Sequence, residues 1–250
     1  MNQTIKALSV LFIIIISGQV FAQNTSGEII FERKQFWVNI YTKLPFLTKE
    51  QIEREMAVWG KDQGNWAEKY LLKFGDNKSI YTQMEEEQNY GYSWRQEEVM
   101  FYRDYKEKTL TDKLPLGAKD YLLTGDIPRI KWKIQNELRD IQGYICMKAI
   151  AEHPIYGTPV TAWYTDLIPL GGGPEGFGGL PGMILMLTFN EDDVVIEATS
   201  VKLNVEGSKV ELPKKLKGKE IALDKYVEDK KKFMKEALDN RRNPYNNLRY

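Results

Sequence analysis

The chain has 250 residues, with 35 basic and 35 acidic side chains, one histidine and one cysteine. This even balance of charge excludes a strongly basic nucleic-acid-binding protein, so we expect no nucleic acid partner. A single histidine excludes a zinc site built from several histidines, and a single cysteine excludes an intramolecular disulfide. We therefore predict no metal and no cofactor.

The first 22 residues have the composition of a secretory signal peptide. Lys6 precedes an apolar run over residues 7–16, and the segment ends on the small residue Ala22. The run is far shorter than the roughly 20 apolar residues of a spanning helix, so we predict cleavage after Ala22 and no transmembrane segment in the mature chain. No cysteine follows the predicted cut for a lipid anchor, and we expect a periplasmic or secreted location.

Alternation of apolar and polar residues predicts a chain composed mostly of β-strands. The predicted strands lie at residues 28–40, 70–74, 79–84, 97–105, 130–134, 143–150, 160–165, 183–189 and 194–203. Turn residues at 75–78 join two of them into a hairpin, and the acidic run at 190–193 joins the last two. Most connections are too short for helical crossovers, which favours antiparallel neighbours.

Two helices are predicted beside these strands. Thr48 and Gln51 have the spacing of a capping box, and Gly60 ends the helix that they begin. Ile52 and Met56 fall on one face of this helix. Residues 220–240 form a second, charged helix with a narrow apolar stripe, which we expect to lie on a surface.

These elements predict a mainly β (α+β) fold, built as a single curved antiparallel sheet or open half-barrel of about eight to eleven strands with one or two packed helices. No linker or low-complexity run divides residues 23–250, so we predict one β-rich domain. By analogy, such a fold is similar to the open half-barrels of periplasmic lipoprotein carriers, which shelter an apolar ligand on the concave face.

A glycine-rich loop lies in the stretch 168–187 and leads directly into an apolar segment. Residues 171–182 contain seven glycines and two prolines, so the backbone there must adopt positive φ angles or approach another group too closely for a Cβ atom. Gly171, Gly173 and Gly176 have the spacing of a dinucleotide fingerprint. Because the next predicted element is a strand and not a helix, we expect no bound nucleotide.

The end of this loop carries a family resemblance. Residues 179–184 read Gly-Leu-Pro-Gly-Met-Ile, which resembles the hexapeptide of the GLPGLI family of secreted bacterial proteins, with Met183 in place of leucine. The segments at 143–149 and 161–165 resemble the flanking strands of that family. The resemblance implies a protein exported by a gram-negative bacterium, commonly found among outer-membrane uptake systems. It implies no established activity and no catalytic residues.

Four reactive or charged features have simple structural interpretations. We predict that His153 is a solvated imidazole in a turn and that Cys146 is a small buried residue within a strand. The acidic runs at 85–87 and 191–193 lie at predicted turns, and we expect solvated carboxylates there. Weak calcium binding is the alternative for the second run, because calcium prefers oxygen ligands.

Aromatic residues beside the glycine-rich loop give the one candidate binding site. Folding of the loop back on itself would place aromatic surface next to a glycine-lined groove, which suits a peptide, a sugar or an acyl chain. The competing interpretation is that the rings fill the core and the glycines only permit a sharp turn of the chain. The candidate residues are Trp163, Tyr164, Phe177, Gly178, Gly179, Leu180, Pro181 and Gly182.

These observations favour a non-catalytic exported binding or carrier module for a hydrophobic or peptide ligand, associated with outer-membrane uptake. An accessory protein that docks on an outer-membrane transporter through the glycine-rich loop is the alternative. A hydrolase is the third hypothesis and has the least support, because the motifs present do not assemble a nucleophile, a base and an oxyanion donor.

Overall fold

The computed structural model describes residues 26–60, 67–84, 99–205 and 209–246. The predicted signal peptide and the acidic run at 85–87 lie outside these residues. None of the described helices is both long enough and apolar enough to cross a membrane.

The described chain forms one open sheet of twelve strands, which confirms the predicted fold class. Every neighbouring pair is antiparallel except β12 and β6, which are parallel. The order across the sheet is β12-β6-β5-β4-β3-β2-β1-β11-β10-β9-β8-β7. The strands are β1 (Gly27–Gln35), β2 (Ala67–Gly75), β3 (Lys78–Gln83), β4 (Met100–Asp104), β5 (Thr109–Leu116), β6 (Lys119–Asp126), β7 (Lys133–Ile141), β8 (Tyr144–Glu152), β9 (Pro159–Thr165), β10 (Met183–Phe189), β11 (Val194–Leu203) and β12 (Lys219–Ala222).

The core lies on one face of the central strands. Alternate residues of β1 are buried, and every residue of β10 is buried. Tyr70 and Tyr81 stack face to face with their ring centroids 4.9 Å apart, and Phe31 and Phe101 meet Tyr81 edge-on. The edge-on contacts are favoured by aromatic quadrupoles, and the four rings bury large apolar areas along β1 to β4.

Local turn chemistry explains two connections that the sequence predicts. Asp76 and Asn77 have φ angles of 51° and 58°, as a two-residue hairpin turn requires, and they join β2 to β3. Asn190, Glu191 and Asp192 also have positive φ and join β10 to β11. Both predicted turns are confirmed.

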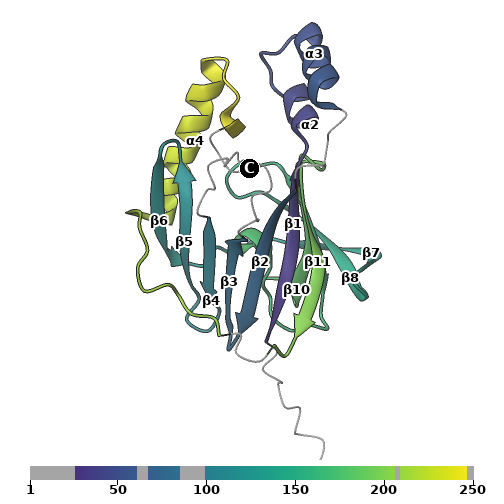
Figure 1. Ribbon diagram of the computed structural model, residues 1–250, viewed down its shortest axis with the longest axis vertical. Coiled ribbons are helices and arrows are strands. Elements are labelled where there is room, and N and C mark those ends of the chain that lie inside the picture. The colour runs from purple at the N-terminus through teal and green to yellow at the C-terminus, as the bar shows by residue number, and fades with distance from the viewer. Residues whose placement is uncertain (1–25, 61–66, 85–98, 206–208, 247–250) are drawn as a thin grey trace, which may run out of the picture.

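Within the described residues, three α-helices accompany the sheet: α2 (Trp37–Thr42), α3 (Lys49–Trp59) and α4 (Leu223–Asp239). The capping box is confirmed, because Thr48 Oγ1 accepts from Gln51 N at 3.3 Å and Gln51 Oε1 accepts from Thr48 N at 2.9 Å. The expected apolar face of α3 is not buried, since Met56 is 46% exposed. In Figure 1, α2 and α3 stand beyond the end of β1, and α4 lies beside β5 and β6.

The structure corrects the predicted first strand and the strand count. The strand predicted over residues 28–40 ends at Gln35, because Phe36 N donates to Asp193 O at 2.8 Å and the chain then turns into α2. Strands β5, β6 and β12 were not predicted from the pattern. In β5, Asp112 and Lys113 are both buried, so charged residues occupy positions where the alternation rule expects apolar ones.

Candidate functional site

The glycine-rich loop folds back on itself before it enters β10. Gly179 N donates to Gly171 O at 2.9 Å, and Ile184 N donates to Gly172 O at 2.9 Å. A short 3-10 helix, η2 (Pro174–Gly176), forms the tip of the loop. The predicted sharp return of the chain is therefore present.

Two glycines show why the loop needs this composition. A Cβ atom at Gly182 would overlap the backbone carbonyl oxygen of Thr165, on the neighbouring strand β9. Gly176 has a φ of +72°, and a Cβ atom there would overlap the guanidinium group of Arg103. Larger residues at either position would push the loop away from the sheet.

The loop occupies the concave side of the sheet. Its tip η2 contacts β3 and β4 on one side and β10 on the other, although β10 and β4 are separated by several strands in the sheet order. One short segment can touch both only if the sheet curves around it. Trp132 Nε1 donates to Gly178 O at 2.9 Å and closes the loop from the side of β7.

Buried ion pairs hold the loop tip in place. Arg33 Nε donates to Glu175 Oε1 at 3.0 Å, and both side chains are at most 5% exposed. Arg103 binds both carboxylate oxygens of Asp112 and donates from Nε to Gly176 O at 3.3 Å. Burial raises the pKa of Asp112, and the adjacent Arg103 opposes this effect. Removing one partner of such a pair leaves an uncompensated buried charge and strongly destabilises the fold. These contacts therefore keep the loop in its position.

His153 lies in the core and not in solvent, so the prediction of a solvated imidazole is wrong. The ring packs among Tyr156, Phe177 and Phe189, with ring centroids 4.5, 5.6 and 5.4 Å away. Its Nδ1 accepts from the backbone N–H groups of residues 155 and 156. Burial, and secondarily the positive charge of Lys230, lowers the pKa of His153 to about 3. The imidazole is therefore neutral and serves as an acceptor for the turn.

Cys146 agrees with its predicted structural role. The residue is fully buried, and burial raises the pKa of its thiol to about 12. A thiol with this pKa is not ionised near neutral pH and is a poor nucleophile.

Most of the predicted binding residues are packed inside the molecule. Trp163, Tyr164, Phe177 and Leu180 are each at most 9% exposed and belong to the main core cluster. Arg139 covers Trp163, with its guanidinium carbon 4.7 Å from the ring centroid. Gly182 is buried and Gly178 is partly buried, whereas Gly179 and Pro181 are exposed. The packing of these rings agrees with the competing interpretation, in which they fill the core.

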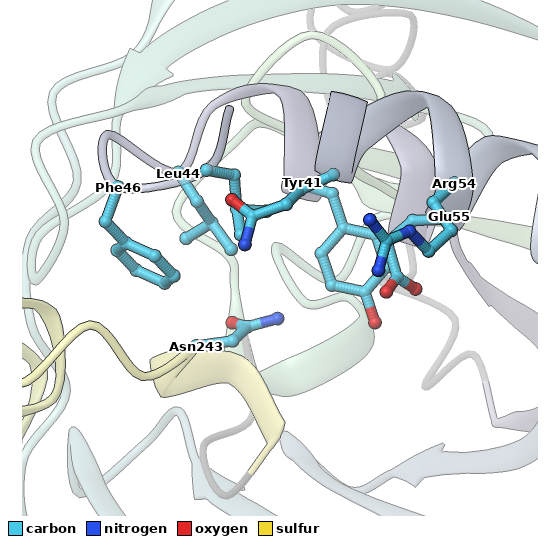
Figure 2. Close-up of a pocket in the computed structure, with 8 residues that line it drawn as sticks. Tyr41, Leu44, Phe46, Arg54, Glu55 and Asn243 are labelled. Carbon is cyan, nitrogen blue, oxygen red and sulfur yellow. The ribbon is translucent and has the colours of Figure 1, made fainter. Parts of the chain in front are cut away.

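A separate pocket opens at the rim of the sheet, between the α2–α3 segment and the C-terminal segment that follows α4. Its volume is about 190 Å³ (Figure 2). We call it the rim pocket. It is lined by Tyr41, Leu44, Phe46, Leu47, Gln51, Arg54, Glu55 and Asn243.

One side of the rim pocket is apolar and the other is polar. Leu44 is buried, and Phe46 and Leu47 are partly buried around the apolar side. Asn243 lies across the pocket from Leu44 in Figure 2, and its amide nitrogen is buried without an acceptor among the described residues. Burial, together with the nearby charge of Glu55, raises the pKa of Tyr41. A ligand with an apolar body and a hydrogen-bond acceptor fits these surroundings.

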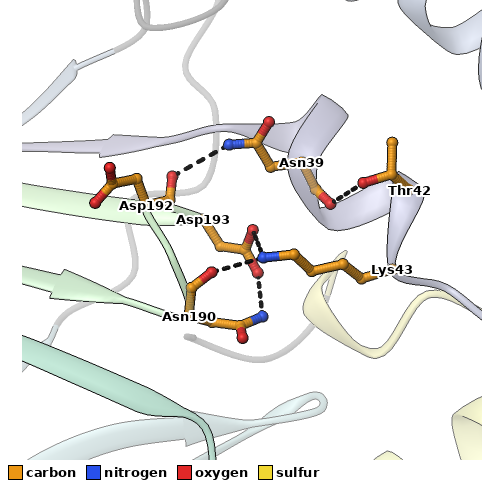
Figure 3. A network of polar contacts seen from close by, with 6 residues as sticks. All are labelled: Asn39, Thr42, Lys43, Asn190, Asp192 and Asp193. Carbon is orange, nitrogen blue, oxygen red and sulfur yellow. Dashed lines mark hydrogen bonds and ion pairs between the residues drawn. The ribbon is translucent and has the colours of Figure 1, made fainter.

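Helix α2 carries the pocket residues Tyr41 and, just beyond its end, Leu44, and a polar network holds this helix to the sheet (Figure 3). Lys43 Nζ lies 2.8 Å from Asp193 Oδ1 and donates to Asn190 O at 2.6 Å. Asp193 was expected to be a solvated acid, but its side chain is 1% exposed. That expectation is wrong, because the carboxylate is used to anchor Lys43 and the turn between β10 and β11.

The rim pocket could not be predicted from the sequence. Its walls come from residues 41–55 and from Asn243, which the fold brings together from opposite ends of the chain. The only local signal is the apolar content of residues 44–47 between two helices, which could also belong to an ordinary core.

Comparison with known proteins finds similarity over a short part of this region. A family model described as "Protein of unknown function (Porph_ging)" matches residues 152–186, which include His153, β9 and the glycine-rich loop. No curated protein matches the chain.

Two solved structures resemble the fold. They are the structures of PNGF-II in the C2 and P21 space groups, each 17% identical, with TM-scores of 0.51 and 0.50. Each match covers 82% of this chain but only 32% and 33% of the PNGF-II chain. The chain thus spans about a third of the length of these structures, and at this identity the likeness shows the fold alone.

Proposed function

We propose that the protein is a non-catalytic binding module that holds a peptide segment through one side chain seated in the rim pocket. The observation that carries this proposal is the contrast between the concave side of the sheet and the rim pocket. The concave side of the sheet is filled by the glycine-rich loop and its ion pairs, whereas the rim pocket is open.

The size of the rim pocket favours a single anchor residue. Pockets for whole small-molecule ligands usually have volumes of roughly 300–1,000 Å³. The rim pocket has about 190 Å³, which suits one large side chain. A peptide that inserts one residue can continue along the exposed surface on either side, so its affinity does not depend on this volume alone.

The chemistry of the lining favours a peptide over an acyl chain. Leu44, Phe46 and Leu47 offer an apolar wall for the side chain. Gln51 and Arg54 on the polar side offer donors for a backbone carbonyl. An acyl chain would gain nothing from a polar wall and needs a longer apolar cavity. Because the glycine-rich loop fills the concave face, the described residues provide no such cavity there. A free peptide and an exposed segment of an outer-membrane transporter would present the same chemistry to the pocket.

The non-catalytic part of the proposal is supported by the state of His153. This only imidazole of the chain is neutral, packed among aromatic rings and already bonded through Nδ1 to two backbone amides. A general base needs a pKa near the working pH and access to a substrate proton. His153 has neither property. Export to the periplasm and association with outer-membrane uptake remain parts of the same proposal.

Peptide selection tests this proposal directly. Purified protein is used to select binders from a random peptide display library, and the affinities of the selected peptides are measured by calorimetry. We expect Leu47→Trp, which fills the pocket, to weaken binding by about tenfold or more. Leu212→Trp is the matched control, since Leu212 is a partly exposed leucine that does not line the pocket.

Two results would reject the proposal. One is a library that yields no specific binder, together with binding of a fluorescent fatty acid. The other is a set of peptides whose affinity is the same for Leu47→Trp as for Leu212→Trp. Circular dichroism of both variants checks that the fold is retained.

A further inference from the structure

The last strand of the sheet, β7, has an unprotected edge. It ends the strand order, so its outer side has no neighbouring strand in the described part of the chain (Figure 1). The β7–β8 hairpin also exposes three large apolar side chains: Ile134 is 52% exposed, Leu138 is 67% exposed and Ile145 is 56% exposed. Folded proteins usually protect such edges, because open backbone groups beside apolar side chains recruit another strand.

The three apolar side chains lie on one face of the hairpin. Ile134 pairs with Ala149, Leu138 pairs with Met147 and Asp140 pairs with Ile145, and the register shifts between Ile134 and Leu138. Directly opposed residues share a face, and so do residues two apart along β8. The exposed apolar side chains therefore share one face that reaches the free edge, where Asp140 also lies, opposite Ile145.

Glu137, Arg139 and Lys148 occupy the opposite face and are held in fixed positions. Glu137 binds Lys148 Nζ at 2.9 and 3.0 Å. The Arg139 guanidinium carbon lies 4.7 Å from the centre of the Trp163 ring, and Lys148 Nζ lies 5.8 Å from the same centre. Glu137 and Arg139 thus flank Leu138 on the strand and point to the face away from it.

We propose that a second copy of this chain pairs antiparallel with β7 across a two-fold axis at Leu138. In this register Glu137 of each copy lies opposite Arg139 of the other, so two opposite-charge pairs form on one face. Leu138 meets its own copy on the other face, with Ile145 beside it. The sheets of the two copies then form one continuous sheet across the dimer.

The alternative registers of the same strand pair are less complementary. A two-fold axis at Asn136 places Lys133 opposite Arg139, which sets like charges against each other. An axis at Glu137 brings two carboxylates together. Like charges directly opposite are destabilising. An axis at Gln135 sets Lys133 opposite Glu137, but it centres the pairing on the irregular stretch between Ile134 and Leu138. Charge and strand geometry together favour the axis at Leu138. This self-complementarity is the reason to assign the edge to a second copy rather than to an unrelated strand.

Disulfide trapping tests the register. In a Cys146→Ala background, we expect Leu138→Cys to form a disulfide-linked dimer under mild oxidation, because directly opposed Cα atoms lie within the reach of a disulfide. Ile134→Cys is the matched control. In the proposed register the two copies of residue 134 lie on the order of 25 Å apart, which no disulfide can bridge.

Charge exchange tests the pairing in solution by sedimentation equilibrium. We expect Glu137→Arg and Arg139→Glu each to weaken dimerisation by roughly tenfold or more, and the double variant to restore it. Both the Arg139→Glu variant and the double variant lack the contact between Arg139 and Trp163. Recovery of dimerisation in the double variant would therefore be due to the restored charge pair between residues 137 and 139. A monomer at all concentrations, equal trapping at 134 and 138, or a double variant as weak as the single ones would each overturn the proposal.

Discussion

At the scale of single residues, the buried His153 makes the stability of the fold depend on pH. The pKa of His153 is about 3 in the folded protein and about 6.5 in an unfolded chain. The unfolded state therefore binds a proton first, and the stability that the neutral imidazole provides is present above pH 6.5 and is lost as the pH falls toward 3. No other histidine obscures this effect.

We expect the free energy of unfolding to fall by about 2 kcal/mol between pH 7.5 and pH 5 because of this one residue. Urea denaturation across this range measures it. His153→Asn keeps an acceptor near the two backbone amides but does not titrate, so the variant is expected to be less stable at every pH and to lose most of the slope. An unchanged slope in His153→Asn would contradict the buried-imidazole account.

The second residue-scale prediction concerns Gly182. Its Cβ position is filled by the carbonyl oxygen of Thr165, which belongs to a paired strand and cannot move freely. We expect Gly182→Ala to lower the free energy of unfolding by about 2 kcal/mol or more. Gly60→Ala is the control, because its Cβ would make only an ordinary contact with Met56 and its backbone is helical. Equal effects of the two substitutions would contradict the close approach of the loop to β9.

At the scale of elements, the contact between α2 and the β10–β11 turn supports the rim pocket. Asp193 is buried and binds Lys43, which follows α2, and Phe36 N donates to Asp193 O. We expect Asp193→Ala to destabilise the fold by about 2 kcal/mol, since it removes a buried charge-assisted hydrogen bond.

The same variant is also expected to weaken peptide binding, although Asp193 does not line the pocket. Calorimetry with a selected peptide measures this effect. Glu191→Ala removes an exposed acid from the same turn and should change neither stability nor affinity appreciably. Loss of stability without any loss of affinity would mean that the turn does not position the pocket.

Elements governed by local chemistry could be predicted from the sequence. The capping box at Thr48, the hairpin turn at Asp76 and the alternating strand that begins at Val194 each depend on residues that are close in the chain. Strand β5 could not be predicted, because its buried Asp112 is compensated by Arg103 on the neighbouring strand. Alternation of apolar and polar residues does not predict such a buried pair.

The candidate site is built from residues that are far apart in the chain, so it was predicted less well. The aromatic shell of His153 comes from Phe177 and Phe189, and Asn243 reaches the pocket only through the path of the C-terminal segment. The glycine-rich loop was correctly expected to turn sharply. Its role in filling the concave face follows from an ion pair with Arg33 on β1 and a hydrogen bond from Arg103 on β4.

At the scale of the whole molecule, the curved sheet separates three surfaces. The loop fills the inside, the rim pocket opens between α2–α3 and the C-terminal segment, and β7 forms a free edge. The rim pocket is lined by none of the β7 residues, so peptide binding and dimerisation are expected to be independent of each other.

The position of a bound peptide is the most direct test of the central claim. A crystal structure of the protein with the tightest selected peptide would show it. We expect one peptide side chain to lie between Leu44 and Asn243, with Gln51 or Arg54 donating to a peptide oxygen. A peptide that lies along β7 or on the glycine-rich loop, with the rim pocket empty, would contradict the account.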